Sequence, residues 1–395
     1  MEKFVKLKKG KDLSLGRFHP WVFSGAIAAY SDGLNEGDVV KVTDSTGRIL
    51  GYGDWQIGSI AVRMLSFGDN YPSDSYLAEL VRKALNMRMS LNLIRKDNNT
   101  FRLVHGEGDF LPGLIVDIYG DTAVMQAHSP GMHIRRMQLA DILVNLNGLE
   151  IKNVYYKSET TLPFKAGLAP EDGYLIGSDS DCWALENGLT FHIDWLRGQK
   201  TGFFIDQREN RSLLEKYSGG KKVLNMFCYT GGFSVYALRG GAERVVSVDS
   251  SSKAISLTRL NVEKNFLEDK RNRHEAYAED AFKFLDNIGK DEYDLIVLDP
   301  PAFAKHRDAL KNALRGYQRL NAKAISKIAP GSMLFTFSCS QAVSKEQFRL
   351  AVFSAAAETG RRVRILHQLT QPCDHPVNIY HPEGEYLKGL ILYVE

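Results

Sequence analysis

The sequence predicts an α/β protein whose C-terminal half forms a mostly parallel sheet covered by helices on both faces. Two observations lead to this prediction. From about residue 219, short apolar runs alternate with helical patterns, whereas the first 70 residues show short strands between turns. Strand–helix alternation is typical of parallel sheets, because two parallel strands need a crossover that is usually a helix.

Length and composition exclude several other classes. The chain has 395 residues, of which 44% are hydrophobic and 25% charged, so it can bury two or three cores. No apolar run approaches the roughly 18 residues of a membrane-spanning helix, and the N-terminus does not resemble a signal peptide. The four cysteines are widely spaced and no CxxC occurs. We therefore expect a cytoplasmic protein without a metal site or a membrane anchor.

The N-terminal half divides into two predicted parts. Residues 1–70 contain alternating segments at 37–44, 48–54 and 59–65, which indicate a small β-rich module. Residues 71–185 begin with a helical pattern over 72–95 and continue as strands around one helix near 131–146. We expect the second part to be a mixed α/β domain and the third domain to cover residues 186–395.

The C-terminal half supplies the strands and helices of the parallel sheet. Apolar runs predict strands, and the segments between them show helical patterns. The predicted strands cover 223–227, 244–249, 293–299 and 333–337, with a weaker one at 275–278. The predicted helices cover 233–239, 253–265 and 306–328.

A cofactor site is expected where the first two of these strands end. The turn after the first strand contains Tyr229, Thr230 and Gly231, and adjacent glycines allow the backbone to approach a ligand closely. Asp249 ends the next strand, 18 residues after Gly231, where a carboxylate typically binds a ribose diol. The turn is not GxGxxG, holds no basic residue, and no P-loop follows any strand. The pattern therefore favours S-adenosylmethionine over a dinucleotide or a nucleoside triphosphate.

Asp280 is a further candidate for this site. It follows the weak strand at 275–278 and precedes a helical pattern. Its carboxylate is suited to accept a hydrogen bond from the adenine amino group, and it is equally suited to cap the helix. The two roles are compatible.

Two more strand ends carry reactive groups. Asp299 precedes Pro300 and Pro301, which make a rigid corner, and Cys339 follows the strand at 333–337. Parallel strands end at the same edge of the sheet, so both side chains are expected to face one pocket. A thiolate that adds to carbon 6 of a pyrimidine makes carbon 5 nucleophilic toward a methyl donor. The residue types alone leave Cys339 open to this role or to that of a small buried residue.

An ordered set of motifs adds a resemblance to a known family. The segments are 198–211, 227–234, 299–303, 336–340 and 374–377, and residues 16–25 are similar to the start of a PUA module. The chain resembles the bacterial class I methyltransferases that form 5-methylcytosine in large-subunit ribosomal RNA and carry an N-terminal PUA domain. The resemblance covers nearly the whole chain.

The resemblance implies a fold and several residue roles. It implies a PUA barrel, a middle α/β domain and a Rossmann-like domain with a seven-stranded sheet, whose last strand, at 387–394, is antiparallel. It implies that Cys339 is the nucleophile and that Asp206, Gln207 and Arg208 lie near the methionine end of the cofactor. The second cysteine of many related enzymes is replaced here by residues 302–304, so the proton-abstracting base is left unassigned.

Two other functions stay open at this level. One is methylation of a guanine nitrogen, which shares the Asp-Pro-Pro-x-Phe corner but needs no thiol. The other is an RNA-binding assembly factor without catalysis. The expected partner is large-subunit ribosomal RNA, and a homodimer is left open.

A basic stripe on the helix predicted at 306–328 is the candidate RNA contact. Its positively charged residues recur every four positions from Arg307 to Lys327. A solvated helix face is the simpler interpretation for the distal end. The proximal residues Arg307, Lys311 and Arg315 lie nearest the expected pocket, where the phosphates around a flipped cytosine would pass.

Overall fold

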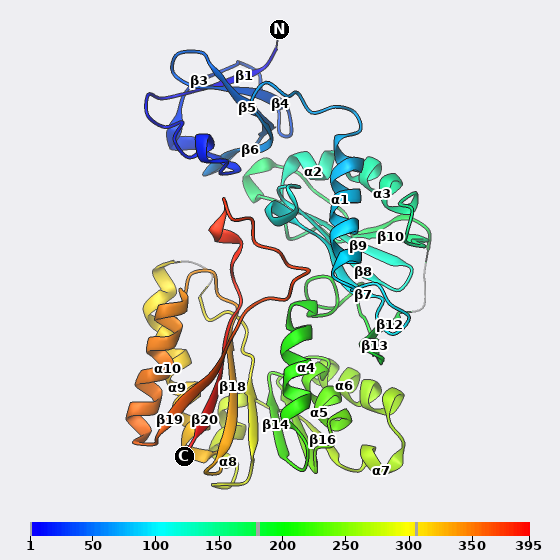
Figure 1. Ribbon diagram of the computed structural model, residues 1–395, viewed down its shortest axis with the longest axis vertical. Coiled ribbons are helices and arrows are strands. Elements are labelled where there is room, and N and C mark those ends of the chain that lie inside the picture. Colours follow the sequence, from blue (N-terminus) through cyan, green and yellow to red (C-terminus); the bar gives the residue numbers. More distant parts are fainter. Residues whose placement is uncertain (1, 179–181, 305–306) are drawn as a thin grey trace. The chain divides into compact units, whose positions relative to one another are not determined.

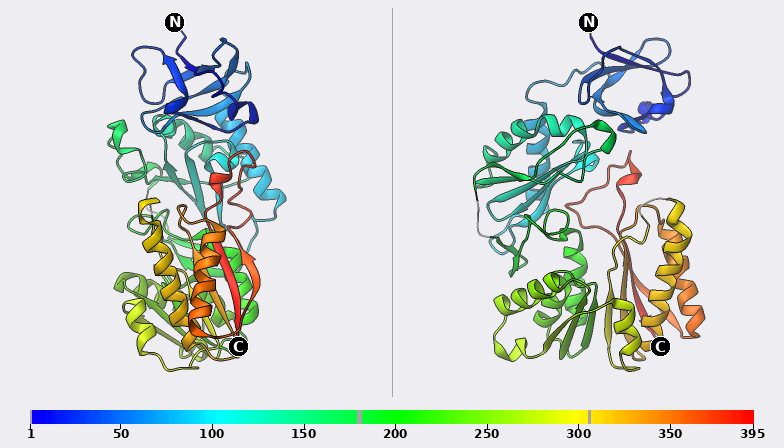
Figure 2. Two further views of the ribbon diagram at one scale, coloured as in Figure 1. Left: turned by 90° about the vertical axis from the view of Figure 1, so that its left-hand side faces the viewer. Right: turned by 180° about the vertical axis from the view of Figure 1, so that it is seen from behind.

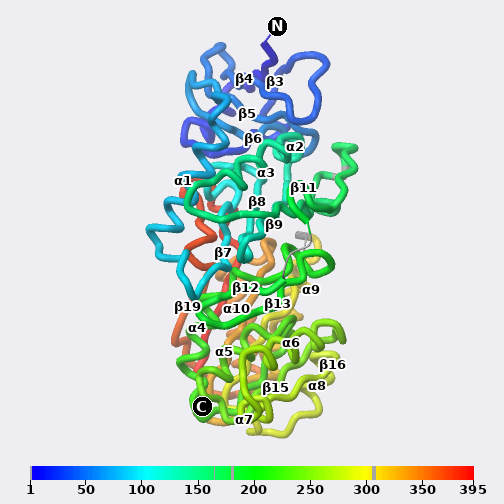
Figure 3. The backbone as a smooth tube through the Cα atoms, turned by 90° about the vertical axis from the view of Figure 1, so that its right-hand side faces the viewer, coloured from blue at the N-terminus to red at the C-terminus, as the bar shows by residue number. Residues whose placement is uncertain are grey.

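The computed structural model describes residues 2–178, 182–304 and 307–395 and divides the chain into two compact units. Unit 1 comprises residues 1–188, 193–205 and 373–384. Unit 2 comprises residues 189–192, 206–372 and 385–395. The chain leaves unit 2 after Pro372 and re-enters it at Glu385. Figure 3 traces the backbone from the N-terminus in blue to the C-terminus in red. The predicted three-domain division stays a prediction.

The N-terminal part of unit 1 is a six-stranded, mainly antiparallel sheet (Figure 1). Its order is β2-β6-β5-β4-β1-β3, and only the pair of β1 with β4 is parallel. Eight buried side chains, including Val5, Val40 and Val62, form its core. The strands are β1 (Phe4–Leu7), β2 (Trp21–Phe23), β3 (Ile27–Tyr30), β4 (Val39–Thr43), β5 (Ile49–Trp55) and β6 (Ile60–Phe67). The β-rich module predicted for residues 1–70 is confirmed.

The middle part of unit 1 is a five-stranded sheet of order β11-β10-β9-β8-β7 with α1 and α3 packed against it (Figure 2). The single helix predicted near 131–146 is two helices, separated at Arg135, whose guanidinium pairs with Asp54. The elements are α1 (Tyr76–Ser90), β7 (Thr100–His105), β8 (Leu114–Tyr119), β9 (Thr122–Ala127), α2 (Pro130–Ile134), α3 (Arg136–Val144), β10 (Asn153–Tyr156), β11 (Gly173–Ile176) and β12 (Trp183–Glu186).

Unit 2 is built on a seven-stranded sheet of order β16-β15-β14-β17-β18-β20-β19. The pairs from β16 through β18 are parallel, and β20 is antiparallel to both of its neighbours. This is the mostly parallel Rossmann-like sheet with an antiparallel last strand that was predicted. The strands are β14 (Lys222–Met226), β15 (Arg244–Asp249), β16 (His274–Ala278), β17 (Leu295–Leu298), β18 (Ser332–Ser338), β19 (Val363–Leu369) and β20 (Lys388–Val394), and β13 (Leu189–His192) also belongs to this unit.

Helices cover both faces of this sheet (Figure 1). On one face, alternate side chains of the strands, such as Leu224, Val246 and Ile296, pack against α8, α9 and α10 in one large core. Helices α4, α5 and α6 lie on the other face. The helices are α4 (Arg208–Tyr217), α5 (Gly232–Arg239), α6 (Ser252–Asn265), α7 (Glu268–Arg271), α8 (Ala281–Asn287), α9 (Leu310–Lys327) and α10 (Lys345–Thr359). Within the described residues, no helix is both long and apolar enough to cross a membrane.

Candidate active site

The strand ends that the sequence predicted to carry chemistry lie along one edge of the unit 2 sheet. Met226 is paired with Val248 on one side and with Leu298 on the other. Leu298 is in turn paired with Thr336. The turn after β14, Asp249, the corner after β17 and the corner after β18 therefore follow one another along the carboxyl edge, where open α/β sheets bind ligands.

The turn after β14 has a strained backbone. Phe227, Tyr229 and Gly231 have φ angles of 58°, 48° and 78°, in the left-handed region that side chains other than glycine rarely adopt. A Cβ atom on Gly231 would lie 2.5 Å from Cγ2 of Thr258. Such strain persists only where the surroundings impose it, and it clusters at ligand sites. Glycine is required at 231 because the Thr258 side chain fills the position of a Cβ atom beside the N-terminus of α5.

Hydrogen bonds from β15 and α6 hold this turn in place. The Tyr229 amide donates to Asp249 Oδ2 at 2.9 Å, and the Tyr229 carbonyl accepts from Thr258 Oγ1 at 2.9 Å. The Thr230 carbonyl accepts from Asn261 Nδ2 at 2.8 Å. The second Asp249 oxygen accepts from the Ser251 amide at 2.9 Å. The turn and the carboxylate that the sequence paired are thus in direct contact.

Asp280 serves as the N-cap of α8. Its side chain accepts a hydrogen bond from the Lys283 amide at 3.0 Å, and the residue is exposed. The capping role that the sequence allowed is therefore present. A cap uses one carboxylate oxygen, so the other can still serve as an acceptor for a ligand.

Asp206, Gln207 and Arg208 form the buried start of α4. Asp206 Oδ2 accepts from the Tyr386 hydroxyl at 2.7 Å, and Gln207 Oε1 accepts from Asn210 Nδ2 at 2.6 Å. Each of the three side chains is at most 6% exposed. Buried polar side chains with fixed hydrogen bonds, such as these three, are suited to orient a charged ligand.

The Asp299 corner is anchored to α9. Asp299 is half-buried, and the Phe303 ring packs against Tyr317 with ring centroids 4.7 Å apart and the ring planes tilted by 40°. A Cβ atom on Gly316 would lie 2.9 Å from the Phe303 ring, so α9 approaches the corner closely at that glycine. Phe303 is one of the residues 302–304 that follow the corner, and its side chain packs against α9.

Cys339 lies between two fully buried serines at the end of β18. Ser338 Oγ donates to the Tyr317 hydroxyl at 2.9 Å, and Ser340 Oγ donates to the Ala304 carbonyl at 2.6 Å. Both flanking residues are 0% exposed, whereas Cys339 is half-buried. The Ser340 bond also ties the corner after β18 to the loop that follows Asp299. The backbone around the thiol is fixed while its side chain stays accessible.

Charged groups from two further elements act on this corner. Burial, together with the charges of Cys339 and Asp299, raises the pKa of Tyr317 on α9 to about 12. Burial lowers the pKa of Lys388 on β20 to about 8, against an opposing effect of the Cys339 charge. The Tyr317 hydroxyl therefore lies within electrostatic range of both Cys339 and Asp299.

The basic stripe divides into two parts. The 306–328 helix begins only at Leu310, after a 3-10 turn at Arg307–Ala309, and the Arg307 side chain lies outside what the structure describes. Lys311 and Arg315 are exposed, and neither forms an ion pair with a described residue. The distal residues have partners within the fold. Arg319 lies over the Phe282 ring, Lys323 pairs with Asp286, and Lys327 donates to two carbonyls.

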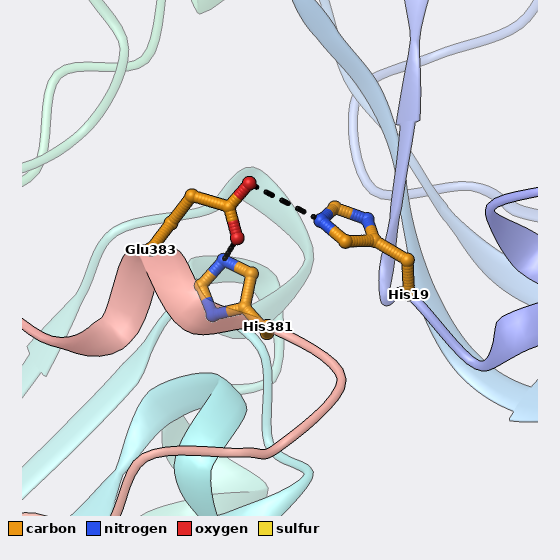
Figure 4. A group of neighbouring side chains, drawn as sticks. All are labelled: His19, His381 and Glu383. Atoms are coloured by element: carbon orange, nitrogen blue, oxygen red, sulfur yellow. Dashed lines mark ion pairs between the residues drawn. The ribbon is translucent and has the colours of Figure 1, made fainter.

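The described residues contain one cluster that resembles a metal site, in unit 1. Figure 4 shows His19, His381 and Glu383, whose ligand atoms lie within 4.8 Å of one another. However, His19 Nδ1 accepts from the Trp21 amide, so the neutral ring carries its proton on Nε2. That nitrogen faces Glu383 at 3.5 Å. His19 is therefore arranged as a donor to the glutamate and not as a metal ligand.

Comparison with known proteins identifies the family. Residues 166–382 match the S-adenosylmethionine-dependent methyltransferase family, and residues 5–67 match a PUA-like domain. A protein of Tolumonas auensis named ribosomal RNA large subunit methyltransferase I is 37% identical over 400 residues, covering 99% of both chains. The chain belongs to this methyltransferase family. The resemblance stated from the motifs, including the N-terminal PUA domain, is thereby confirmed.

Solved structures support the fold of this methyltransferase. An S-adenosylmethionine-dependent methyltransferase of Streptococcus mutans covers all of both chains with a TM-score of 0.83 at 22% identity. A second methyltransferase, solved in complex with S-adenosylhomocysteine, gives a TM-score of 0.83 at 21% identity. The cofactor of this family is S-adenosylmethionine, as predicted. Asp249 beside the Gly231 turn fits it, because the carboxylate keeps acceptor positions beyond those used by the Tyr229 and Ser251 amides.

Sequence reasoning gave no chemical role to three residues beside this methyltransferase site. Tyr317 contacts Ser338, Tyr386 contacts Asp206, and Lys388 lies beside the Cys339 corner. Tyr317 shows only as one apolar position of an amphipathic helix. Lys388 gives one local signal, a lysine at the start of an otherwise apolar strand, which is unusual for a buried strand.

Proposed function

We propose that this methyltransferase forms 5-methylcytosine in large-subunit ribosomal RNA through a covalent adduct between Cys339 and carbon 6 of the cytosine. The proposal is carried by the accessible Cys339 thiol at the carboxyl edge of the unit 2 sheet. It lies next to the Asp299 corner, between two serines whose side chains are fixed by hydrogen bonds. The target RNA is proposed from the name that the curated relatives share.

The residues around the cofactor turn have separate tasks in this proposal. Asp249 binds the ribose hydroxyls, Asp280 accepts from the adenine amino group, and the backbone of Tyr229, Thr230 and Gly231 packs against the cofactor. Asp206, Gln207 and Arg208 surround its methionine end. When bound, S-adenosylmethionine supplies an electrophilic methyl group.

The chemistry needs a thiolate and a carboxyl group at one place. The Cys339 thiolate adds to carbon 6, and the electron pair of the ring double bond makes carbon 5 nucleophilic. Asp299, hydrogen-bonded at ring nitrogen 3, stabilises the adduct. Carbon 5 takes the methyl group and loses its proton, and the bond from sulfur to carbon 6 then breaks to restore both the ring and the thiolate.

RNA that contains 5-fluorocytosine tests the proposal. Fluorine cannot leave carbon 5 as a cation, so the adduct should persist after methyl transfer, and peptide mass spectrometry should place it on Cys339. Cys339→Ala should give no adduct, whereas Cys373→Ala, which removes an exposed cysteine, should give as much as wild type. An enzyme that methylates RNA without forming an adduct, or that methylates a guanine nitrogen, would show the proposal to be wrong.

A further inference from the structure

A buried lysine reaches the nucleophile corner from the antiparallel strand. Lys388 begins β20 and is paired in register with Ser338, the residue before Cys339. Only 6% of Lys388 is exposed. A fully buried ammonium group is costly unless hydrogen bonds and a countercharge compensate it. The position of Lys388 therefore calls for an explanation.

Two of the three donor positions of Lys388 are used by the backbone of the same corner. Nζ donates to the Ser340 carbonyl at 2.6 Å and to the Val343 carbonyl at 2.9 Å. Lys388 Nζ forms no ion pair with a carboxylate of the described residues. The nearby Glu385 pairs with Lys345 instead. A protonated amine has three N–H groups. One donor and the positive charge thus remain for a partner at this corner.

The charges around the corner point to the thiol as that partner. The groups that act on Lys388 are Cys339 and Glu385, which favour its charged form, and Lys345, which opposes it. From α9, Tyr317 responds to both Cys339 and Asp299. A cation next to a thiol lowers the thiol pKa and increases the thiolate fraction.

We propose that Lys388 supplies the positive charge that keeps Cys339 as a thiolate. At neutral pH the proton of the thiol goes to solvent, and the protonated Lys388 acts on the sulfur through its charge. Lys388 is thus a positioning residue that acts through Cys339. The purpose of the thiolate rests on the proposed function, but the charge coupling itself does not.

The pH dependence of Cys339 alkylation tests this coupling without RNA. The full-length protein is treated with iodoacetamide between about pH 5.5 and 9.5, and peptide mass spectrometry follows each cysteine. The wild-type midpoint for Cys339 should lie below the ordinary thiol value of about 8.5, and Lys388→Met should raise it by about one unit or more. The midpoint is compared instead of the alkylation rate at one pH. A thiolate of higher pKa is more nucleophilic, which partly offsets the lower rate expected from a smaller thiolate fraction.

Several controls separate charge from structure. Lys345→Met removes a half-exposed positive charge nearby and should shift the Cys339 midpoint much less. Lys388→Arg, which keeps the charge, should retain a lowered midpoint. The midpoint of the exposed Cys373 should stay constant in every variant. Binding of S-adenosylhomocysteine verifies that each variant is folded.

The outcomes also separate this proposal from the proposed function. A wild-type midpoint at or above about 8.5, or an equal midpoint in folded Lys388→Met, would overturn the role of Lys388. If the midpoint shifts as expected but RNA with 5-fluorocytosine forms no adduct, the charge coupling between Lys388 and Cys339 is supported and the proposed cytosine methylation is wrong.

Discussion

At the scale of single residues, the cofactor site depends on how many hydrogen bonds one carboxylate accepts. Asp249 accepts from Tyr229 with one oxygen and from Ser251 with the other. An ionised carboxylate has about four lone-pair positions, so positions remain for two ribose hydroxyls. The same side chain thus shapes the turn and, in the proposed function, binds the ligand.

Asp249→Ala should weaken S-adenosylmethionine binding. Loss of a charged hydrogen-bond partner typically costs about 1.5–3 kcal/mol, or roughly 10- to 150-fold in affinity. Isothermal titration of the wild type and the variant measures the change. A dissociation constant equal to that of wild type would rule out a role for Asp249 in binding.

Asp280 offers a variant pair that separates ligand binding from helix capping. Asp280→Ser keeps a good N-cap but removes the carboxylate, whereas Asp280→Ala removes both. Affinity for the cofactor should fall in both variants. Thermal stability should fall only in the alanine variant, by about 1 kcal/mol. Equal affinity in wild type and Asp280→Ser would leave Asp280 with the cap alone.

At the scale of elements, α9 connects catalysis to the proposed RNA contact. Its buried face carries Tyr317 and contacts the Asp299 corner, and its exposed face carries Lys311 and Arg315. The distal basic residues are engaged within unit 2. Phosphate binding is therefore expected only at the end of the helix nearest the corner.

Replacing Arg307, Lys311 and Arg315 with alanine should weaken RNA binding and its salt dependence. Each phosphate contact contributes roughly −0.7 to the slope of log affinity against log salt on single strands, so the slope should flatten by about 2 units. The variant with alanine at Arg319, Lys323 and Lys327 loses the same charge and should change the slope little. Equal slopes for wild type and the proximal variant would show that these residues do not contact phosphate and that the stripe is only a solvent-exposed helix face.

At the scale of the whole molecule, a series of side-chain hydrogen bonds links strands β14, β15 and β16 of the unit 2 sheet through α5. It runs from Asn225 to Ser234 (2.9 Å), from Ser234 to Ser247 (2.7 Å) and from Ser247 to His274 Nε2 (2.8 Å). Burial and the nearby Arg259 lower the pKa of His274 to about 4, whereas Glu275 opposes the shift. The histidine is therefore neutral in the folded sheet at neutral pH.

This histidine predicts a loss of unit 2 stability in acid. Unfolded histidine titrates near pH 6.5, so the unfolded state takes up a proton first as the pH falls from there to about 4. The slope contributed by His274 is at most about 1.4 kcal/mol per pH unit. Hydrogen exchange of β14–β16 peptides should lose protection between pH 7 and 5, and His274→Gln should lose less. Unit 1 peptides should lose protection equally in wild type and His274→Gln. If the β14–β16 peptides also lost protection with pH equally in the two proteins, His274 would not be the group responsible.

The sequence alone determined most of the elements of unit 2 and the methyltransferase family of this protein. Strand–helix alternation predicted the sheet of unit 2, because periodicity is a local property of the chain. The Gly231 turn, Asp249, Asp299 and Cys339 were found because each directly follows a predicted strand, and parallel strands bring their ends to one edge. The division of the 131–146 helix was not foreseen, because its break at Arg135 has no proline or glycine to mark it.

Only the tertiary structure decided which distant residues complete the site. Lys388 is 48 residues from Ser340 in the chain, Tyr386 is 180 residues from Asp206, and Ser340 is 36 residues from Ala304. Such contacts leave no local pattern, because they arise from the order and direction of the strands. The antiparallel insertion of β20 beside β18 places a buried lysine at the corner that carries Cys339, and sheet topology is a property of the whole chain.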